Sequence, residues 1–204
     1  MGHIDNRIYL ASQSPRRREL LKQLGVHFEV LVMRASPGRE DVVEAPQDKE
    51  TPAQFAVRMA REKSQCGAKI VRMRRLVLMP VLGADTVLDI DGEIIGKPRD
   101  LDHAMEILTR LSGRAHWVHT GVAMTWTHGT ESRLSSSRVE FAPISSETIA
   151  RYLESGEALD KAGAYGIQGR AGAFATRIEG SYTGIMGLPL HETAALLNLA
   201  DIKV

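Results

Sequence analysis

Cysteine, aromatic residues and an excess of charge of one sign are all scarce in this chain. Cys66 is the only cysteine, which excludes an internal disulfide and any zinc site built from several cysteines. So few cysteines also fit a reducing compartment. Lysine and arginine number 26 against 25 aspartates and glutamates, so the net charge of +1 gives no reason to expect a nucleic-acid or membrane partner.

Long hydrophobic runs are absent as well. No window reaches the roughly 18 apolar residues that a membrane-spanning helix needs. Residues 1–7 are polar and lack the apolar core of a signal peptide, so none is predicted. The chain has 204 residues, of which 43% are hydrophobic, as in ordinary soluble proteins. This length suits one α/β domain over residues 1–204, with two small lobes around a cleft.

The hydrophobic pattern predicts strands and helices in a mixed order. We expect strands at residues 8–11, 28–33, 76–82, 87–90, 93–95, 115–127, 133–141 and 173–178. Helices are predicted from residue 15 to 24, from 51 to 66 or 68, and at 102–111, 146–153 and 189–199. Residues 34–50 are predicted to form a long loop, and a Gly-rich turn precedes the last helix. Several strands follow one another directly, which favours a mixed sheet flanked by helices over a strict Rossmann alternation.

The first predicted helix begins with an unusual concentration of positive charge. Ser14 is a typical N-cap, Pro15 suits the first helical position, and three arginines follow at 16–18. The positive end of the helix dipole disfavours each arginine there by about 0.3–1 kcal/mol. Free backbone N–H groups and guanidinium groups together would bind a polyphosphate, which would relieve this repulsion. The alternative, a solvated basic surface, stays open at this point.

Asp85 and Lys97 are the next candidates for a site. Asp85 is predicted to lie at the carboxyl end of the most apolar strand, where α/β sheets place ligands. It could equally serve as a turn or cap residue. Lys97 lies between Gly96 and Pro98, so a phosphate could approach the backbone closely and meet a point charge. The segment is not a P-loop, because the glycines stand one residue too close and a proline replaces the hydroxyl residue.

Eight short motifs, in this order along nearly the whole chain, resemble the Maf family of nucleotide pyrophosphatases. They are residues 10–17 (LASQSPRR), 61–63 (REK), 83–86 (GADT), 96–98 (GKP), 112–113 (SG), 119–122 (HTGV), 160–169 (DKAGAYGIQG) and 187–189 (GLP). The resemblance implies an α/β fold with a curved mixed sheet flanked by helices. It also implies two lobes with a deep cleft between them, as in inosine-triphosphatase-like enzymes. A cytoplasmic homodimer that acts on a nucleoside triphosphate with a divalent cation, Mg²⁺ or Mn²⁺, is implied in the same way.

The resemblance also carries roles onto individual residues. Asp85 would be the catalytic base and, with Glu44, would hold the metal; alone, Glu44 would be taken for a surface acid. The phosphates would be held by Ser12, Arg16, Arg17, Lys63 and Lys97. The chain departs from the family at Val43, where an aspartate commonly precedes the glutamate. Asp41 or Glu40 would have to compensate.

Three positions resemble the branch of the family that acts on dTTP and UTP, namely Arg16, Thr86 and Gln168. The amide of Gln168 both donates and accepts, so it can pair with the adjacent N3–H and O4 of a uracil-type base. The expected reaction is metal-assisted attack of water on the α-phosphate, which yields the monophosphate and diphosphate.

Three alternatives remain beside this expectation. One is a 7-methyl-GTP-type pyrophosphatase of the same family. Another is a non-catalytic nucleotide-binding regulator, which Val43 favours. The third is a nucleic-acid-binding protein, which the basic runs 16–18 and 69–75 favour. The near-neutral charge and the lack of interleaved aromatic residues count against this last alternative.

Overall fold

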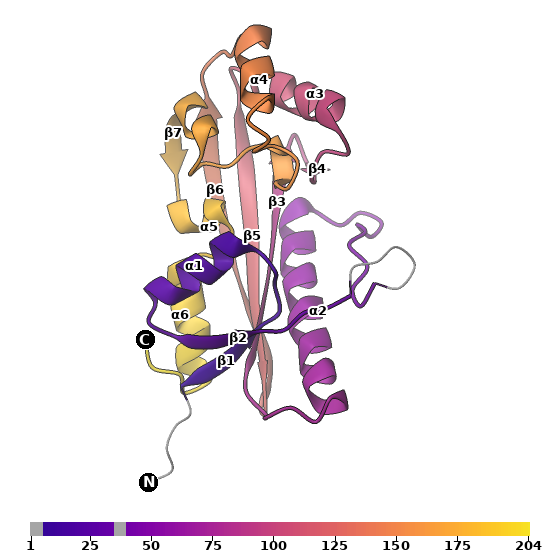
Figure 1. The fold of residues 1–204 in the computed structure, drawn as a ribbon, viewed down its shortest axis with the longest axis vertical. Coiled ribbons are helices and arrows are strands. Elements are labelled where there is room, and N and C mark those ends of the chain that lie inside the picture. Colours follow the sequence, from indigo (N-terminus) through magenta and orange to yellow (C-terminus); the bar gives the residue numbers. More distant parts are fainter. Residues whose placement is uncertain (1–5, 35–39) are drawn as a thin grey trace.

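The computed structural model describes residues 6–34 and 40–204, which form a mixed β-sheet with helices on both faces (Figure 1). The helices are α1 (Pro15–Gln23), α2 (Pro52–Met73), α3 (Leu101–Leu111), α4 (Ser146–Leu153), α5 (Tyr182–Met186) and α6 (Leu190–Leu199), with 3-10 turns at Ala162–Ala164 and Arg170–Phe174. The strands are β1 (Arg7–Leu10), β2 (His27–Val30), β3 (Val81–Ile90), β4 (Glu93–Ile95), β5 (Ala115–Trp126), β6 (Gly129–Phe141) and β7 (Ala175–Glu179). The predicted mixed sheet flanked by helices is confirmed.

The sheet has the strand order β2-β1-β3-β5-β6-β7, and β4 pairs with β3. β1 runs parallel to β2 and β3, and the other pairs are antiparallel. The three longest strands, β3, β5 and β6, run along most of the length of the molecule (Figure 1). β1, β2 and α6 lie toward one end of these strands, β4, β7, α3 and α4 lie toward the other, and α1 lies near the middle (Figure 1).

Helix α2 packs its backbone directly on the sheet at two glycines. A Cβ on Gly121 of β5 would lie 2.3 Å from the carbonyl oxygen of Ala56, and one on Gly83 of β3 would lie 2.5 Å from that of Ala60. Ala56, Ala60 and Lys63 are spaced i, i+4 and i+7, so they share one face of the helix. This close approach brings Lys63 over β3 just beyond Gly83.

Two local signals behave as their chemistry predicts. The side chain of Ser14 accepts a hydrogen bond from the N–H of Arg17, and Pro15 is the first residue of α1. Asp91 and Gly92 have φ angles of 56° and 85°, so both adopt the left-handed conformation that a tight β3–β4 hairpin requires. The N-cap, the proline position and the hairpin are therefore confirmed.

The prediction of a strand at residues 76–82 is wrong for most of its length. β3 begins at Val81, opposite Tyr9, and Val77 and Leu78 are 62% and 71% exposed. α2 is longer than predicted, because Ile70 and Val71 keep it packed against the sheet as far as Met73. The apolar residues that follow form the connection back from the helix end to the sheet.

Several element boundaries also differ from the prediction. The second strand ends at Val30 and not at residue 33, and β6 begins at Gly129 and not at residue 133. The Gly-rich turn before α6 contains a short helix, α5, whose N-cap is Ser181. Residues 34 and 40–50 lie outside any helix or strand, as predicted, and residues 35–39 of that predicted loop lie outside the described residues.

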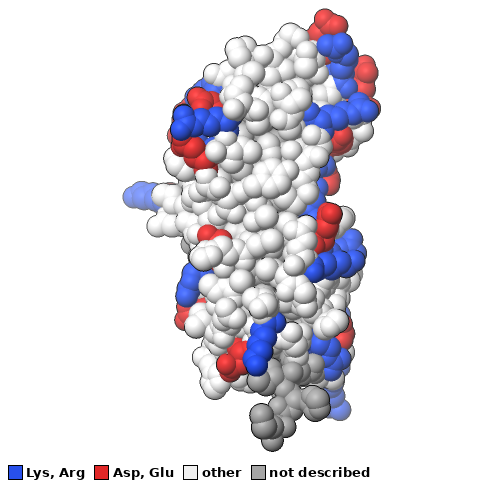
Figure 2. Space-filling view, turned by 90° about the vertical axis from the view of Figure 1, so that its left-hand side faces the viewer, with Lys and Arg blue, Asp and Glu red and all other residues white. Residues whose placement is uncertain are grey.

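The face of the molecule on the side of β7 and α6 is largely uncharged across its middle (Figure 2). On this face, basic side chains mostly stand beside acidic ones (Figure 2). Strand β7 contains such a pair, between Arg177 and Glu179 at 2.6 Å. This pattern gives no support to a nucleic-acid surface on this face. In the described part of the chain, no helix combines the length and the apolar character that a membrane crossing requires.

Candidate active site

A gap along one edge of β3 creates the site. β1 pairs with β3 only at Val81 and Leu82, and β4 pairs with β3 only from Leu88 onward. Among the described residues, 83–87 of β3 therefore have no strand partner on this edge. Asp85 lies in this interval, so its predicted place at the carboxyl end of the strand is wrong. The chain segments that leave β1 and β4 instead open a cleft beside the middle of the strand.

Lys63 joins two carboxylates in this cleft. Its Nζ lies 2.6 Å from Oδ1 of Asp85 and 2.6 Å from Oε1 of Glu44. The side chains of Lys63 and Asp85 are each only 11% exposed, whereas that of Glu44 is 57% exposed. Because a buried charge is stable only beside a compensating partner, Lys63 of α2 and Asp85 of β3 are held together as an ion pair.

The electrostatic surroundings of Glu44 show how many positive charges converge here. Its partial burial opposes ionisation, but Lys63, Lys97 and Arg17 outweigh this effect and hold the pKa of Glu44 below its usual value. These three cations come from α2, from the segment after β4 and from α1. Segments far apart in sequence therefore build one positive environment, as a polyphosphate site requires.

The N-terminal turn of α1 forms another wall of the cleft. No acidic residue lies in this turn, so the positive end of the helix dipole is left for a ligand. Arg17 donates from Nε to the carbonyl oxygen of Gly187 at 2.7 Å and from Nη1 to Oγ of Ser12 at 3.2 Å. It also donates from Nη2 to Oγ1 of Thr86 at 3.2 Å. Burial lowers the pKa of Arg17, and the carboxylate of Asp85 opposes this shift.

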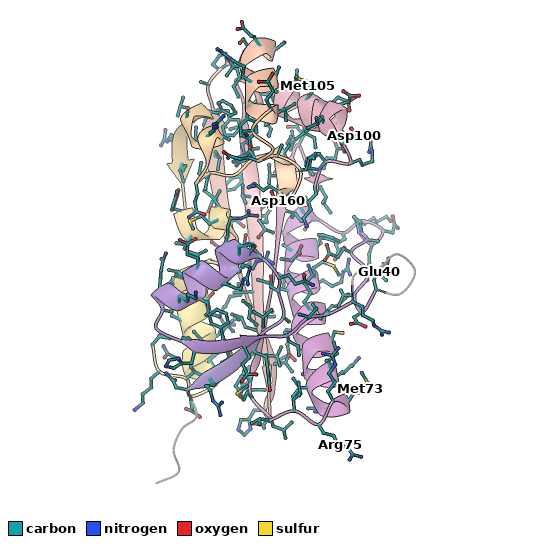
Figure 3. All side chains as sticks on the ribbon, in the orientation of Figure 1. Glu40, Met73, Arg75, Asp100, Met105 and Asp160 are labelled. Atoms are coloured by element: carbon teal, nitrogen blue, oxygen red, sulfur yellow. The ribbon has the colours of Figure 1, made fainter. Side chains whose placement is uncertain are left out.

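Arg16 turns toward a different partner. Its Nη1 lies 3.4 Å from Oδ2 of Asp160, which lies near the centre of the molecule in Figure 3. Asp160 also accepts a hydrogen bond from Lys161 at 2.5 Å. Burial opposes the ionisation of Asp160, but Lys161 and Arg16 together hold its pKa below the usual value. This contact ties the arginine turn to the glycine-rich segment 160–169.

Lys97 and Gln168 lie in the cleft as exposed side chains. Their two segments are connected, because the N–H of Gly163 donates to the carbonyl oxygen of Gly96 at 2.9 Å. The hydroxyl of buried Tyr165, in the same segment as Gln168, lies 2.8 Å from Nε2 of His116 on β5. A hydrogen bond into the core therefore anchors the segment that carries Gln168.

The cleft has a volume of about 1150 Å³. This exceeds the range of about 300–1,000 Å³ that is usual for small-molecule sites, so a nucleoside triphosphate has room. Every residue to which the sequence assigned a role lines it, namely Ser12, Arg16, Arg17, Glu44, Lys63, Asp85, Thr86, Lys97 and Gln168. The basic run 69–75 lies elsewhere, at the far end of α2, where Figure 3 labels Arg75. The structure thus brings the arginine turn to the site but not this second basic run.

The family resemblance predicts an aspartate at position 43, where this chain has valine, and Asp41 does not substitute for it. Both oxygens of its carboxylate are used by Arg34, which donates from its backbone N–H at 2.7 Å and from Nη2 at 2.7 Å. These hydrogen bonds hold the pKa of Asp41 below its usual value. Val43 lines the cleft with its side chain exposed, and so does the neighbouring acid, Glu40.

The carboxylates of Glu44 and Asp85 suit a divalent cation in part. No group of three or more His, Cys, Asp and Glu side chains that could enclose a metal occurs within residues 6–34 and 40–204. However, both carboxylates converge on one cation, the ammonium of Lys63. Mg²⁺ is commonly held by one or two carboxylates and completed by substrate phosphates and water. The residues present therefore fit a metal that a triphosphate helps to hold.

Two groups of the site escaped the sequence reasoning. The carbonyl of Gly187 fixes Arg17, and the buried hydroxyl of Thr120 contacts that of Thr86 at 2.9 Å. Both residues belong to motifs that resemble the Maf family, but neither residue type suggests a role by itself. A backbone carbonyl and a buried threonine acquire a role only because the fold brings them into hydrogen-bond contact with Arg17 and Thr86.

Comparison with known proteins identifies a family and several individual proteins to which this chain is similar. The family described as Maf-like protein matches residues 7–200. A dTTP/UTP pyrophosphatase of Nitrosomonas europaea is 49% identical over 98% of this chain and 97% of its own. Proteins of the same name from Aromatoleum aromaticum and Dechloromonas aromatica are 52% and 53% identical, covering 97% and 94% of this chain and 97% and 96% of their own. The solved structure of the Staphylococcus aureus Ham1 protein aligns at 18% identity with a TM-score of 0.45, over 67% of this chain and 72% of that one.

Proposed function

Because the chain belongs to the Maf family, we propose that it hydrolyses dTTP and UTP to the monophosphate and pyrophosphate. Relatives about half identical over nearly their whole length carry that activity in their names. One structural observation supports the proposed chemistry above all. Lys63 holds the carboxylates of Asp85 and Glu44 at 2.6 Å, in a cleft that Arg17 and Lys97 also line.

In the proposed reaction, water attacks the α-phosphorus and the bond from that phosphorus to the bridging oxygen breaks. Asp85 accepts a proton from the attacking water, because its side chain lines the cleft beside the stretch of β3 that has no strand partner on this edge. Lys63, Arg17 and Lys97 stabilise the negative charge that develops on the departing pyrophosphate. Ser12 and Arg16 contribute further donors at the turn that precedes and begins α1.

Asp85 and Glu44 would also hold a divalent cation, Mg²⁺ or Mn²⁺. When bound, the cation neutralises phosphate charge and orients the displacement. The ammonium of Lys63 keeps the two carboxylates close together, so the protein supplies oxygen ligands that are already near their places.

For base selection we assign Gln168, with Arg16 and Thr86 in support. The side-chain amide of Gln168 is exposed in the cleft and is able to pair with both N3–H and O4 of a thymine or uracil ring. A base that leaves such a group unpaired is bound less well. This argument favours dTTP and UTP over a 7-methyl-GTP-type substrate.

A substrate panel with purified protein tests the proposal. dTTP, UTP, dCTP, GTP and 7-methyl-GTP are incubated with Mg²⁺ or Mn²⁺, and pyrophosphate and phosphate are measured separately. We expect pyrophosphate from dTTP and UTP above all. In water enriched in heavy oxygen, the label should enter dTMP; label in pyrophosphate would contradict attack on the α-phosphorus.

The rival function is a nucleotide-binding protein without catalysis, which the apolar Val43 favours. Such a protein would bind dTTP in calorimetry and yet release no pyrophosphate with either metal. The family resemblance further supports a cytoplasmic homodimer. Sedimentation at two protein concentrations tests the dimer, and a single monomeric species at both would contradict it.

A further inference from the structure

A chain of hydrogen bonds runs from Arg17 to the backbone of α5 through two threonines. Nη2 of Arg17 lies 3.2 Å from Oγ1 of Thr86, which lies 2.9 Å from Oγ1 of Thr120. Thr120 donates in turn to the carbonyl oxygen of Gly184 at 2.8 Å. Thr86 and Thr120 stand directly opposite each other on β3 and β5, so the sheet fixes their separation.

The direction of every hydrogen bond in this chain is determined by its two ends. A guanidinium group only donates, so Thr86 accepts from Arg17. A carbonyl oxygen only accepts, so the single hydroxyl proton of Thr120 goes to Gly184. Thr86 must therefore donate its own proton to Thr120. As long as this chain is intact, Thr86 has no proton left for a ligand and offers only a lone pair.

Helix α5 and its C-cap residue, Gly187, thus hold Arg17 from two sides. The carbonyl of Gly184 ends the threonine chain, and the carbonyl of Gly187 accepts from Nε of Arg17 at 2.7 Å. Gly187 has a φ of 114°, a conformation that other residues rarely adopt, so its carbonyl is directed by a glycine-specific turn. Thr120 itself is completely buried, which leaves its hydroxyl no water as a substitute partner.

The contacts leave part of the guanidinium group for a ligand. A guanidinium has five N–H groups. Among the described residues, three of them have acceptors, on Gly187, Ser12 and Thr86. One N–H on each terminal nitrogen remains, which is the number that a bidentate contact with a phosphate needs.

We propose that Thr120 is a positioning residue that orients Arg17, through Thr86, for bidentate binding of a substrate phosphate. This inference rests on the proposed function, because it takes the ligand of Arg17 to be a phosphate of the nucleotide. Thr120 touches no substrate in this scheme. It acts by accepting the hydroxyl proton of Thr86. This hydrogen bond orients the Thr86 hydroxyl so that one of its lone pairs faces Nη2 of Arg17.

The test compares Thr120→Val, which keeps the shape of the side chain and removes the hydroxyl, with Thr120→Ser, which keeps the hydroxyl. We expect kcat/KM for dTTP to fall about tenfold in Thr120→Val, because a buried acceptor is lost. Thr120→Ser should stay within about twofold of the wild type, since the same hydrogen bonds can form. Calorimetric binding of inorganic pyrophosphate should weaken in parallel in Thr120→Val alone.

A double-mutant cycle separates positioning from a general structural effect. In an Arg17→Ala background, Thr120→Val should change kcat/KM by less than about twofold, because the group through which it acts is gone. Thr193→Val is the matched control: the equally buried hydroxyl of Thr193 donates to the carbonyl of Pro189, the N-cap residue of α6, at 2.7 Å. It should leave kcat/KM unchanged.

Three outcomes would overturn the inference. They are wild-type kinetics in Thr120→Val, an equal loss with and without Arg17, and a loss in Thr120→Ser as large as that in Thr120→Val. If Thr120→Val does not fold, the serine variant and its cycle with Arg17→Ala decide: a serine variant that loses activity independently of Arg17 contradicts the proposal, and one near wild type supports it. A wild-type protein that releases no pyrophosphate from any nucleotide would instead refute the proposed function.

Discussion

The cleft has two halves that differ in how their charged and polar groups are held. In the buried half, Lys63, Asp85 and Arg17 are each fixed by hydrogen bonds of 2.6–3.2 Å. In the exposed half, Lys97 and Gln168 have no hydrogen bond or ion pair to any described residue. The first set projects from α1, α2 and β3, and the second from the irregular segments after β4 and after the turn at Ala162–Ala164.

The side chains in the two halves of the cleft also differ in the roles proposed for them. Groups that stabilise developing charge act best when they are already in place, because no reorganisation is then needed during the reaction. Groups that recognise a base can adjust when the ligand arrives, since side-chain rearrangement at binding sites is common. A rigid half for chemistry and an adaptable half for recognition is what this cleft offers.

The largest expected effect removes the base from the buried half. Asp85→Asn should lower kcat by at least about a hundredfold, because the amide cannot accept the proton of water. Lys63 keeps Glu44 as its partner, so the variant should remain folded. Steady-state kinetics with dTTP, together with circular dichroism, measure both. Near-normal turnover by a folded Asp85→Asn protein would remove Asp85 from the mechanism.

The two lysines compare the halves directly. Lys63→Ala leaves the buried carboxylate of Asp85 without its cation, so unfolding free energy should fall by roughly 3 kcal/mol. Lys97→Ala removes an exposed side chain and should change that free energy by less than about 0.5 kcal/mol, while kcat/KM falls about tenfold. Urea titrations measure the unfolding free energy of each variant, and steady-state kinetics measure its kcat/KM. Equal destabilisation by the two substitutions would erase the proposed distinction.

A smaller effect is expected at the recognition end. Gln168→Ala should lower the preference for dTTP over dCTP by about fivefold, because one side-chain amide distinguishes the two base edges. The rate with a poor substrate should change little. The measurement is the ratio of kcat/KM values in wild type and variant. A uniform loss on all nucleotides would place Gln168 in phosphate binding or structure instead.

The smallest effect concerns how the recognition segment is anchored. Burial lowers the pKa of His116 to about 4, so the neutral ring is favoured in the folded state. Stability should therefore be complete above the unfolded pKa of about 6.5 and should decline as pH falls toward 4. Between pH 7 and 5.5 the loss is about 1 kcal/mol. Urea unfolding at both pH values should show this loss in the wild type and not in His116→Gln; the same loss in both would exclude His116 as its source.

Local chemistry in the sequence was sufficient for some features and not for others. The cap at Ser14 and the hairpin at Asp91 and Gly92 depend on neighbouring residues alone, and both were predicted. The prediction of a strand at residues 76–82 is wrong because the apolar pattern does not show that α2 continues to Met73. Asp85 lies inside β3 and not at its end, because pairing with β5 continues through Asp85 as far as Asp89.

The sequence by itself determined which residues carry charge and hydrogen-bonding groups, and its ordered motifs identified the family. Only the tertiary structure decided that the cleft opens along an unpaired stretch of β3 and that Lys63 joins two carboxylates. Only the fold, likewise, connects Arg17 to α5 through two threonines. The physical reason is that strand pairing and buried hydrogen bonds are long-range interactions. Lys63 and Asp85 are 22 positions apart in the sequence, Thr86 and Thr120 are 34 apart, and Arg17 and Thr86 are 69 apart, so no local pattern encodes these contacts.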